Sequence, residues 1–341
     1  MIFIHSDSDE NSTDDVMDWL FYLGDREILR LNDAICIEKM THFIGDSLGN
    51  SYIRTSRGED NLFREIESNW YRRGGYMFSQ NSVPASLFEY STIASAINQY
   101  YYKESQQVFD TYYHDLFHRL NGLNRFSDNR INKIEVLSKA FRQGLKIPNT
   151  IVTNSYSDLM DFAKEKNAII TKAISNGVVR FMVNEEAEMV FGIGTSKLTY
   201  NELVAQSSKY VDDHLAFSVA QEYVEKQIEI RSFYIGGSFF SMAIFSQSNE
   251  KTALDYRRYD FERPNRFIPF QLPDDIEVKL HSLMEDMSMN SGSFDIIYTP
   301  EKEYVFLEVN PIGQYQWLTK HCNYFIDREI ASFLLKFDKE V

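Results

Sequence analysis

Cysteine is scarce in this sequence, and long apolar stretches are missing. Among the 341 residues only Cys36 and Cys322 are cysteines, and they lack the C-x-x-C spacing typical of a metal site. This usage favours a reduced cytoplasmic setting over a disulfide framework. No run approaches the ~20 apolar residues of a membrane span, and residues 1–4 lead straight into a polar stretch, unlike a signal peptide. We therefore expect a cytoplasmic protein with no membrane partner.

Basic side chains are also few for a chain of this length. Lysine and arginine number 35 against 50 aspartates and glutamates, which gives a formal net charge of −15. A surface this acidic repels nucleic-acid phosphates and anionic membranes. We therefore expect no nucleic-acid partner, whereas a partner with basic segments fits the charge.

Several catalytic signatures are missing as well. The sequence has no GxxxxGK[ST] phosphate loop, no G-x-S-x-G turn and no H-E-x-x-H helix. P-loop nucleotidases, α/β-hydrolases and zincin proteases are therefore not indicated. The chain does exceed the ~250–300 residues at which a single core stops growing, so two or three lobes are expected.

The N-terminal segment has the pattern of an α/β lobe. Residues 2–5 and 27–32 are predicted as strands, joined by a helix over residues 16–23 that Ser12 or Thr13 caps. A helical stretch follows from residue 84 to about residue 120, and it is rich in tyrosine. Packing or an interface is the expected role of these tyrosines.

Two histidines of that helical stretch have a spacing seen in metal sites. His114 and His118 lie four residues apart and share one face of a helix. No third ligand is evident nearby, so a surface or packing role is expected instead.

From about residue 125 onwards, short helices and strands alternate. We expect a helix over residues 131–140 that ends at Gly144, then a helix over 157–166 and strands over 168–172 and 178–183. This pattern divides the chain into an N-terminal α/β domain with a helical segment (1–125), a central subdomain (126–205) and a C-terminal subdomain (206–341). The expected fold class is α/β with α+β parts.

Near the C-terminus three oxygen-bearing side chains lie on two adjacent predicted strands. Asp295 belongs to strand 293–298, and Glu308 and Asn310 belong to strand 304–310. Because side chains alternate along a strand, Glu308 and Asn310 share one face, and Asp295 of a paired strand can join them, whereas Leu307 is expected on the other face. Such hard oxygen ligands suit Mg²⁺. A solvated polar face is the alternative.

Two further segments have features of a nucleotide site. Lys172 ends a predicted strand and is followed by the turn 175–177, so its side chain can reach phosphates. Residues 221–224 are predicted to be extended and can offer backbone groups to adenine, while Glu229 can accept from ribose hydroxyls. An ordinary strand with an exposed glutamate is the alternative.

Taken in order, these segments resemble the ATP-grasp ligases. The matching residues are Asn132-Lys133, Gly144, Pro148, Thr150, Lys172, Gln221-Glu222-Tyr223-Val224, Glu229, Arg231, Asp295, Glu308, Asn310, Pro311 and Gly313. Within that superfamily, segments 1–6, 18–20, 255–259 and 306–317 are similar to the graspetide maturases, the microviridin-type and grasp-with-spasm peptide ligases. The resemblance covers essentially the whole chain and implies an ATP-grasp fold preceded by an N-terminal α/β lobe.

The resemblance also implies roles for individual residues. Lys133 and Lys172 would contact ATP phosphates, the 221–224 segment would hold adenine, and Glu229 would hold the ribose. Two Mg²⁺ ions would be bound by Asp295, Glu308 and Asn310. The catalytic cations would be Arg231, Arg257 and Lys172.

Two segments leave alternatives open. Arg257, Arg258, Arg263 and Arg266 crowd one loop of an otherwise acidic chain, which suits either a carboxylate-rich substrate or simple solvation. The turn 175–177 is poorer in glycine than the phosphate-covering turns of many ATP-grasp enzymes, so the residues that close over ATP are not identified.

The function implied is ATP-dependent macrocyclisation of a ribosomally made precursor peptide. Asp or Glu side chains would be activated as acyl phosphates and joined to Thr or Ser hydroxyls, the favoured case, or to Lys amines. A ligase that acts on free amino acids or small peptides is the alternative, and a nucleotide-binding pseudoenzyme is a third. A homodimer through the tyrosine-rich helical segment is also considered.

Overall fold

The computed structural model of the chain describes residues 1–32, 35–42, 51–58, 60–75, 77–78, 83–174, 178–183, 188–192, 194–210, 212–258 and 260–336. Contacts divide the chain into two compact units. The first comprises Met1–Arg130, Met289–Ser291 and Pro311–Val341, and the second comprises Ile131–Ser288 and Gly292–Asn310. The three-domain division at residues 125 and 205 stays a prediction.

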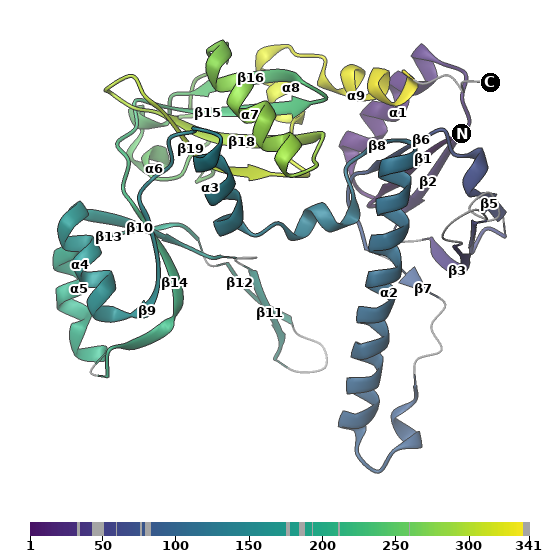
Figure 1. Cartoon of the computed structure of the whole chain (residues 1–341), viewed down its shortest axis with the longest axis horizontal. Coiled ribbons are helices and arrows are strands. Elements are labelled where there is room, and N and C mark those ends of the chain that lie inside the picture. Colours follow the sequence, from purple (N-terminus) through teal and green to yellow (C-terminus); the bar gives the residue numbers. More distant parts are fainter. Residues whose placement is uncertain are drawn as a thin grey trace. The chain divides into compact units, whose positions relative to one another are not determined.

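A four-stranded parallel sheet forms the centre of the first unit (Figure 1). Its strands, in spatial order, are β2 (Ile28–Asn32), β1 (Ile2–Ser6), β6 (Ser68–Tyr71) and β8 (Asn121–Leu123). Every residue of β1 and β6 is buried, as expected for parallel strands that are covered on both faces. Glycine is required at position 122, where a Cβ would lie 2.6 Å from the Cα of Phe117.

Helix α1 (Asn11–Leu23) packs against helix α9 (Ile326–Leu335), which follows α8 (Gln316–Cys322). The start predicted for α1 was wrong, because the helix begins five residues earlier and Glu10 occupies the N-cap. Ser12 and Thr13 do not cap it. Ser12 donates to the Glu10 carboxylate, and the Thr13 hydroxyl lies 2.6 Å from that of Ser6, so Glu10 and the end of β1 satisfy these two hydroxyls instead.

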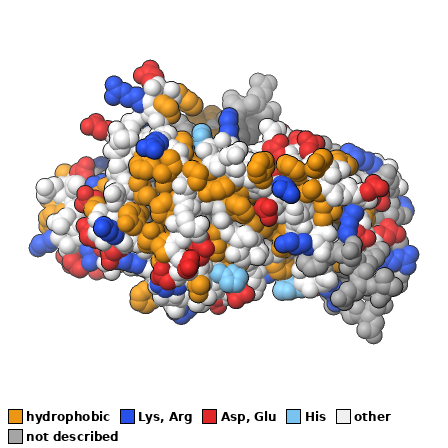
Figure 2. All heavy atoms as spheres, turned by 90° about the horizontal axis from the view of Figure 1, so that it is seen from above, with side chains coloured by type: hydrophobic (Ala, Val, Ile, Leu, Met, Phe, Trp, Pro, Cys, Tyr) orange, Lys and Arg blue, Asp and Glu red, His pale blue; other side chains and the backbone are white. Residues whose placement is uncertain are grey.

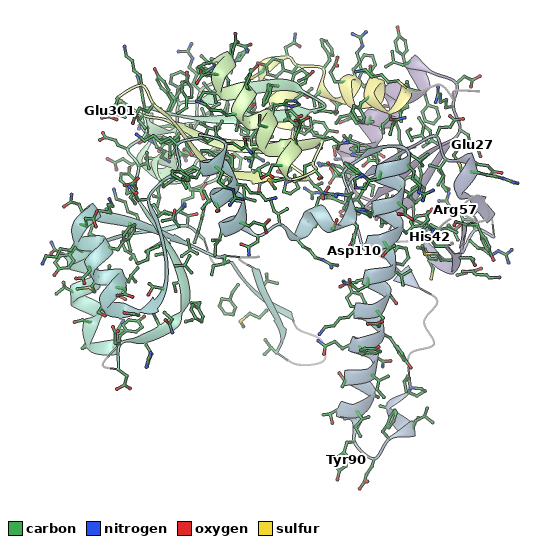
Figure 3. The ribbon with its side chains drawn as sticks, viewed as in Figure 1. Glu27, His42, Arg57, Tyr90, Asp110 and Glu301 are labelled. Atoms are coloured by element: carbon green, nitrogen blue, oxygen red, sulfur yellow. The ribbon has the colours of Figure 1, made fainter. Side chains whose placement is uncertain are left out.

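Helix α2 (Ser91–Arg119) lies against the sheet at its C-terminal end and extends away from it at the other (Figure 1). Its last turns bury Phe109, Tyr112, Tyr113 and Leu116 in the core of the unit. Figure 3 shows Asp110 close to the sheet end and Tyr90 beyond the opposite end of the helix.

The remaining strands of the first unit form a small second sheet. In spatial order they are β5 (Asp60–Leu62), β4 (Tyr52–Thr55), β3 (Cys36–Thr41) and β7 (Met77–Phe78). Ile37 and Ile53 from this sheet join the aromatic side chains of α2 in one hydrophobic cluster, which links the second sheet to the core.

The second unit contains two larger sheets and a hairpin. The first sheet has the order β13 (Ser196–Thr199), β10 (Ala168–Lys172), β14 (His214–Glu222) and β9 (Thr150–Ser155). Helices α4 (Tyr156–Lys166) and α5 (Tyr200–Gln206) bury Leu159, Ala163 and Leu203 with residues of this sheet. Strands β11 (Val178–Met182) and β12 (Glu188–Gly192) form the hairpin.

The second sheet of this unit has five strands. In spatial order they are β17 (Phe267–Phe270), β16 (Ser238–Ile244), β15 (Ile228–Ile235), β18 (Ser291–Tyr298) and β19 (Tyr304–Asn310), with α3 (Lys133–Arg142), α6 (Glu250–Ala253) and α7 (Asp274–Asp286) around them. One face is aromatic, since Phe294 contacts Tyr234, Phe239 and Phe306. The charged side chains of β15 and β18, Glu229, Arg231 and Asp295, alternate with these and occupy the opposite face.

The surface mixes side chains of all kinds. Acidic, basic and hydrophobic side chains are interspersed over the face drawn in Figure 2. Within the part of the chain that the structure describes, we find no helix with the length and apolar character needed to cross a membrane.

Candidate nucleotide and magnesium site

A cavity of about 380 Å³ lies in the second unit, with residues of both larger sheets in its lining. This volume is typical of a small-molecule site. The structure places ten of the predicted site residues in the lining, namely Lys133, Lys172, Gln221, Glu222, Tyr223, Val224, Glu229, Arg257, Asp295 and Glu308. The other two, Arg231 and Asn310, each contact Asp295.

The hairpin of β18 and β19 supplies the acidic end of the cavity. Asp295 pairs with Glu308 and Ser293 pairs with Asn310 in the strand register. The Asn310 amide nitrogen lies 3.2 Å from Asp295 Oδ2. The three predicted metal ligands therefore lie together on one face of this hairpin.

A bulge changes the face expected for one neighbour of these residues. The register of β18 and β19 shifts after Asp295, so that Ile296 pairs with Phe306 and Leu307 is passed over. Leu307 consequently lines the cavity beside Glu308, and its predicted position on the opposite face was wrong. An extra residue in one strand interrupts strict alternation.

Two lysines from different elements hold Glu308. Lys133 is the first residue of α3, and Lys172 is the last residue of β10. Each Nζ lies 3.6 Å from Glu308 Oε2. Burial acts to raise the pKa of Glu308, but the two lysines outweigh it and the pKa falls below its usual value. Glu308 is therefore an anion at neutral pH, at the end of the cavity where phosphates would meet the lysines.

Arg231 is paired with the second carboxylate. Its guanidinium Nη1 lies 2.7 Å from Asp295 Oδ1, and the arginine is only 6% exposed. Burial raises the pKa of Asp295, against the opposing effect of Arg231. Among the described residues the Nε of Arg231 and the hydroxyl of Ser293 are buried without a hydrogen-bond partner. Such orphaned groups are costly, and a bound ligand or water would satisfy them.

Residues 221–224, called the hinge from here on, start with the last two residues of β14. Hydrogen bonds hold this segment to its neighbours. Glu222 uses its side chain and its amide to contact Asn149, with the Asn149 backbone nitrogen 2.9 Å from Glu222 Oε1. The backbone amide of Tyr223 donates to the Ala168 carbonyl at 3.0 Å. The side-chain nitrogen Nε2 of Gln221 donates to Thr150 Oγ1 at 3.1 Å. These contacts fix the backbone of the segment, so its side chains serve the site mainly by positioning it.

Glu229 occupies the same wall, deeper in the sheet. It is 9% exposed, and its Oε1 accepts from Ser246 Oγ at 2.7 Å and from the Lys226 ammonium at 3.0 Å. Burial is the main influence and raises the pKa of Glu229, which Lys226 opposes. Glu229 is thus the buried carboxylate nearest the hinge in the sequence.

The segment 254–257 forms another part of the wall. Asp255 holds the guanidinium of Arg257 through two hydrogen bonds of 2.8 Å, and this hydrogen bonding raises the pKa of Arg257. Between them, Tyr256 is buried, and burial raises the pKa of its phenol far above the usual value. Tyr256 is therefore a neutral hydrogen-bonding group in the cavity wall.

The other arginines of that loop are partly used elsewhere. Arg258 donates to the carbonyl of Thr195 at 3.3 Å, and Arg266 lies over the ring of Phe245. Of the four arginines, Arg257 lines the cavity, and both alternatives for the loop stay open.

The donor set at the acidic end fits Mg²⁺. Two carboxylates and one carboxamide provide oxygen ligands of the type this ion prefers, and Mg²⁺ completes its shell with water and phosphate oxygens. No group of three or more His, Cys, Asp or Glu side chains suited to a metal occurs in the described ranges.

Some residues of the cavity were not predicted from the sequence. Lys226, Tyr256, Ile170 and Ile297 line it. Alternation with Lys172 and with Asp295 gave a signal for Ile170 and Ile297, and Tyr256 lies in the segment 255–259 that carries the resemblance. The predicted phosphate-covering turn, residues 175–177, and Tyr259 lie outside the described residues. His114 and His118 are exposed, with ring centroids 4.3 Å apart.

No family model and no curated protein matches the sequence, but solved structures match the fold. A RiPP-associated ATP-grasp ligase from Chryseobacterium gregarium, in complex with ADP and a leader and core peptide, has a TM-score of 0.77 at 23% identity over 98% of this chain and 96% of that one. The macrocyclase MdnC from Microcystis aeruginosa, bound with precursor peptide MdnA, has a TM-score of 0.74 at 25% identity over 98% and 99%. PsnB, an ATP-grasp ligase with minimal precursor, Mg and ADP, has a TM-score of 0.72 at 16% identity over 98% and 96%.

The chain therefore has the fold of the ATP-grasp ligases, and the predicted fold class is confirmed. Its N-terminal α/β lobe is part of the likeness, because each comparison covers nearly the whole chain. Within that class, the resemblance to the graspetide maturases is confirmed by neighbours that are RiPP-associated ligases and macrocyclases.

Proposed function

We propose that the protein is an ATP-dependent macrocyclase of a ribosomally made precursor peptide. The observation that carries this proposal is the cavity of the second unit, which is lined by the hinge segment, by the buried carboxylate of Glu229 and by a cluster of paired lysines, arginine and carboxylates. These groups suit adenine, ribose and phosphates respectively. Neighbours of the same fold are described as bound to ADP and to leader and core peptides.

ATP would lie with its adenine at the hinge. The amides of Glu222 and Tyr223 are used by Asn149 and Ala168, which leaves the amide of Val224 to donate to the adenine edge. Ile170 and Leu307 come from different sheets and both line the cavity, so they can contact the two faces of the base. We assign Lys133 and Lys172 to the phosphates, because both ammonium groups converge on Glu308.

The proposed chemistry begins with a carboxylate of the peptide. One oxygen of an Asp or Glu side chain attacks the γ-phosphorus of ATP, the bond to the β,γ-bridging oxygen breaks, and ADP leaves. A Thr or Ser hydroxyl, or a Lys amine, then attacks the acyl carbon. Phosphate leaves, the nucleophile loses its proton, and an ω-ester or ω-amide ring closes. Each ring removes one water from the peptide, and esters are the favoured product.

The residues of this chain contribute charge and positioning to that reaction. Arg231, Arg257 and Lys172 would stabilise the negative charge on the transferring phosphoryl group. Asp295, Glu308 and Asn310 would hold Mg²⁺, for which we propose two ions. Magnesium supplies neutralisation of the phosphate charge when it is bound.

The proposed partner is therefore a precursor peptide with a leader and an Asp/Glu- and Thr/Ser-containing core.

A homodimer through α2 is a second proposal, supported by the exposed tyrosines of that helix. A cytoplasmic location is also proposed, in agreement with two free cysteines.

The deciding experiment is intact-mass spectrometry of a precursor peptide encoded beside this gene, after incubation with the protein, ATP and Mg²⁺. We expect successive losses of one water per ring that do not occur without ATP. Sensitivity to mild base would identify esters, and resistance would identify amides. An unchanged peptide mass together with ADP release in the presence of free amino acids would overturn the proposal in favour of a small-molecule ligase.

A further inference from the structure

A buried lysine lies directly between the hinge and β15. Lys226 is 8% exposed, which is rare for lysine unless its charge is paired. Its ammonium donates to the carbonyl of Leu254 at 3.0 Å and lies 3.0 Å from Glu229 Oε1. Lys226 also lines the cavity. One cation thus joins two parts of the wall that are far apart in the sequence.

The first part of the wall is the carboxylate of Glu229. The contacts from Lys226 and from Ser246 Oγ fall on the same oxygen, Oε1. A carboxylate oxygen that accepts from a charged amine and a hydroxyl is held in one orientation. Oε2 takes part in neither of these contacts and is the oxygen that we assign to a ligand in the cavity that Glu229 lines.

The second part of the wall is the segment that begins at Leu254. Asp255, Tyr256 and Arg257 follow it and all line the cavity. Because the Leu254 carbonyl accepts from the Lys226 ammonium, the start of this segment is fixed relative to Glu229. A substitution of Lys226 therefore changes the contacts of both the Glu229 carboxylate and the segment that carries Arg257.

We propose that Lys226 is a positioning residue that orients Glu229 toward the ribose hydroxyls of the nucleotide and makes the enzyme selective for ribonucleotides over deoxyribonucleotides. This inference rests on the proposed nucleotide site. Without the ammonium, Glu229 would be a buried carboxylate with one hydroxyl contact, and an uncompensated buried charge is disfavoured. It would bind a proton, which removes the charge of the acceptor, or turn away from the ribose, and either change weakens the hydrogen bond to the ribose.

The test is the ratio of kcat/KM for ATP to that for 2′-deoxy-ATP and for 3′-deoxy-ATP, measured as ADP release. A hydrogen bond to a charged acceptor is worth roughly tenfold to a hundredfold in this ratio, and we expect the unaltered enzyme to prefer ATP by about that factor over at least one analogue. Lys226→Met should bring the ratio close to one, mainly through a higher KM for ATP. Lys279→Met, which alters a surface lysine paired with Asp275 on α7, should leave the ratio unchanged.

A double-mutant cycle separates positioning from a general loss of stability. Glu229→Gln should itself lower the ratio, and adding Lys226→Met should lower it no further, since both act on one contact. Ser246→Ala removes the other donor to Oε1 without a change in charge and should give a smaller loss in the same direction, which keeps the test available if Lys226→Met does not fold.

Two results would overturn the inference. One is a Lys226→Met enzyme that keeps the full preference for ATP, and the other is independent, additive losses from Lys226→Met and Glu229→Gln. Failure of the unaltered protein to bind any adenine nucleotide would be a different result, because it would overturn the proposed function itself.

Discussion

The charged side chains of the cavity are arranged in opposite pairs. Glu308 forms salt bridges with Lys133 and Lys172, and Asp295 forms one with Arg231. Each buried charge therefore has a partner, without which its burial would be strongly unfavourable. The pairs also leave the pKa of Glu308 lowered, because the lysines outweigh the effect of burial. An ionised Glu308 next to two cations suits the binding of a metal–phosphate complex better than acid–base chemistry.

The metal assignment makes a prediction at this scale. Glu308→Gln and Asp295→Asn should each lower ADP formation by at least 100-fold, since each removes a charged oxygen ligand from the phosphate end. Both variants should still fold and bind the peptide, although Asp295→Asn should melt at a lower temperature because the buried Arg231 loses its charge partner. The measurement is ADP release with ATP, Mg²⁺ and peptide, alongside a melting curve for each variant.

Glu301→Gln is the matched control for these variants. Glu301 lies in the turn of the same hairpin and is exposed (Figure 3), so its substitution should leave ADP release unchanged. Near-normal turnover in Glu308→Gln or Asp295→Asn would contradict the assignment of these residues as metal ligands. Equal losses in all three variants would point to damage of the hairpin instead.

At the scale of elements, the pairing of α1 with α9 contains an unusual carboxylate. Asp327, near the start of α9, is 7% exposed, and its Oδ1 has no hydrogen-bond partner among the described residues. Burial and the nearby charge of Asp15 on α1 raise its pKa to about 6, against smaller opposing effects of Tyr315 and Arg72. Compared with an exposed aspartate, Asp327 in this helix pair therefore favours its protonated form.

The raised pKa of Asp327 predicts a pH-dependent effect on stability. Between about pH 4 and pH 6 the folded chain holds a proton that the unfolded chain releases, so the stabilisation present below pH 4 is lost as the pH rises through 6. Asp327→Asn should therefore raise the free energy of unfolding at pH 7–8, by about 1–2 kcal/mol after allowance for solvent screening. At pH 4 the gain should vanish.

Melting temperatures across pH 4–8 are the measurement for this prediction. A shift of a few degrees at pH 7–8 corresponds to that free energy in a chain of this size. Asp18→Asn, at an exposed position of α1, serves as the control and should show no such pH dependence. A constant shift for Asp327→Asn at every pH would contradict the assigned pKa.

At the scale of the whole molecule, α2 is the element with the clearest surface for association. Tyr100, Tyr101 and Tyr102 lie together on it and are each about half exposed, whereas the tyrosines nearer its C-terminal end are in the core. Aromatic side chains of this kind are enriched in protein interfaces. Composition and structure thus support the same helix for the homodimer proposed above.

The homodimer proposal predicts a change in oligomeric state. Substitution of all three tyrosines by serine should convert a dimer to a monomer, because it removes the aromatic area of the contact. Sedimentation at several protein concentrations measures this, and ADP release shows whether the site persists. Tyr22→Ser, at a more exposed aromatic of α1, should leave the dimer intact. An unaltered protein that sediments as a monomer at all concentrations would refute the proposal.

Local patterns of the sequence predicted much of the architecture. Strands β10 and β19 have the predicted bounds, because alternation and turn residues are properties of a few neighbouring residues. The polar residues of the β18 and β19 hairpin were predicted to lie together for the same reason. The start of α1 was not, since its hydroxyls are satisfied by the end of β1 and by Glu10 instead of by the helix amides.

The sequence by itself determined the type of each charged residue of the cavity and the order in which these residues occur along the chain. Only the tertiary structure decided that Lys226 joins Glu229 to Leu254 and that Leu307 faces the cavity. The physical reason is distance along the chain. Alternation acts between neighbours, whereas an ammonium that bridges two segments and a bulge that shifts a register depend on how separate strands pack.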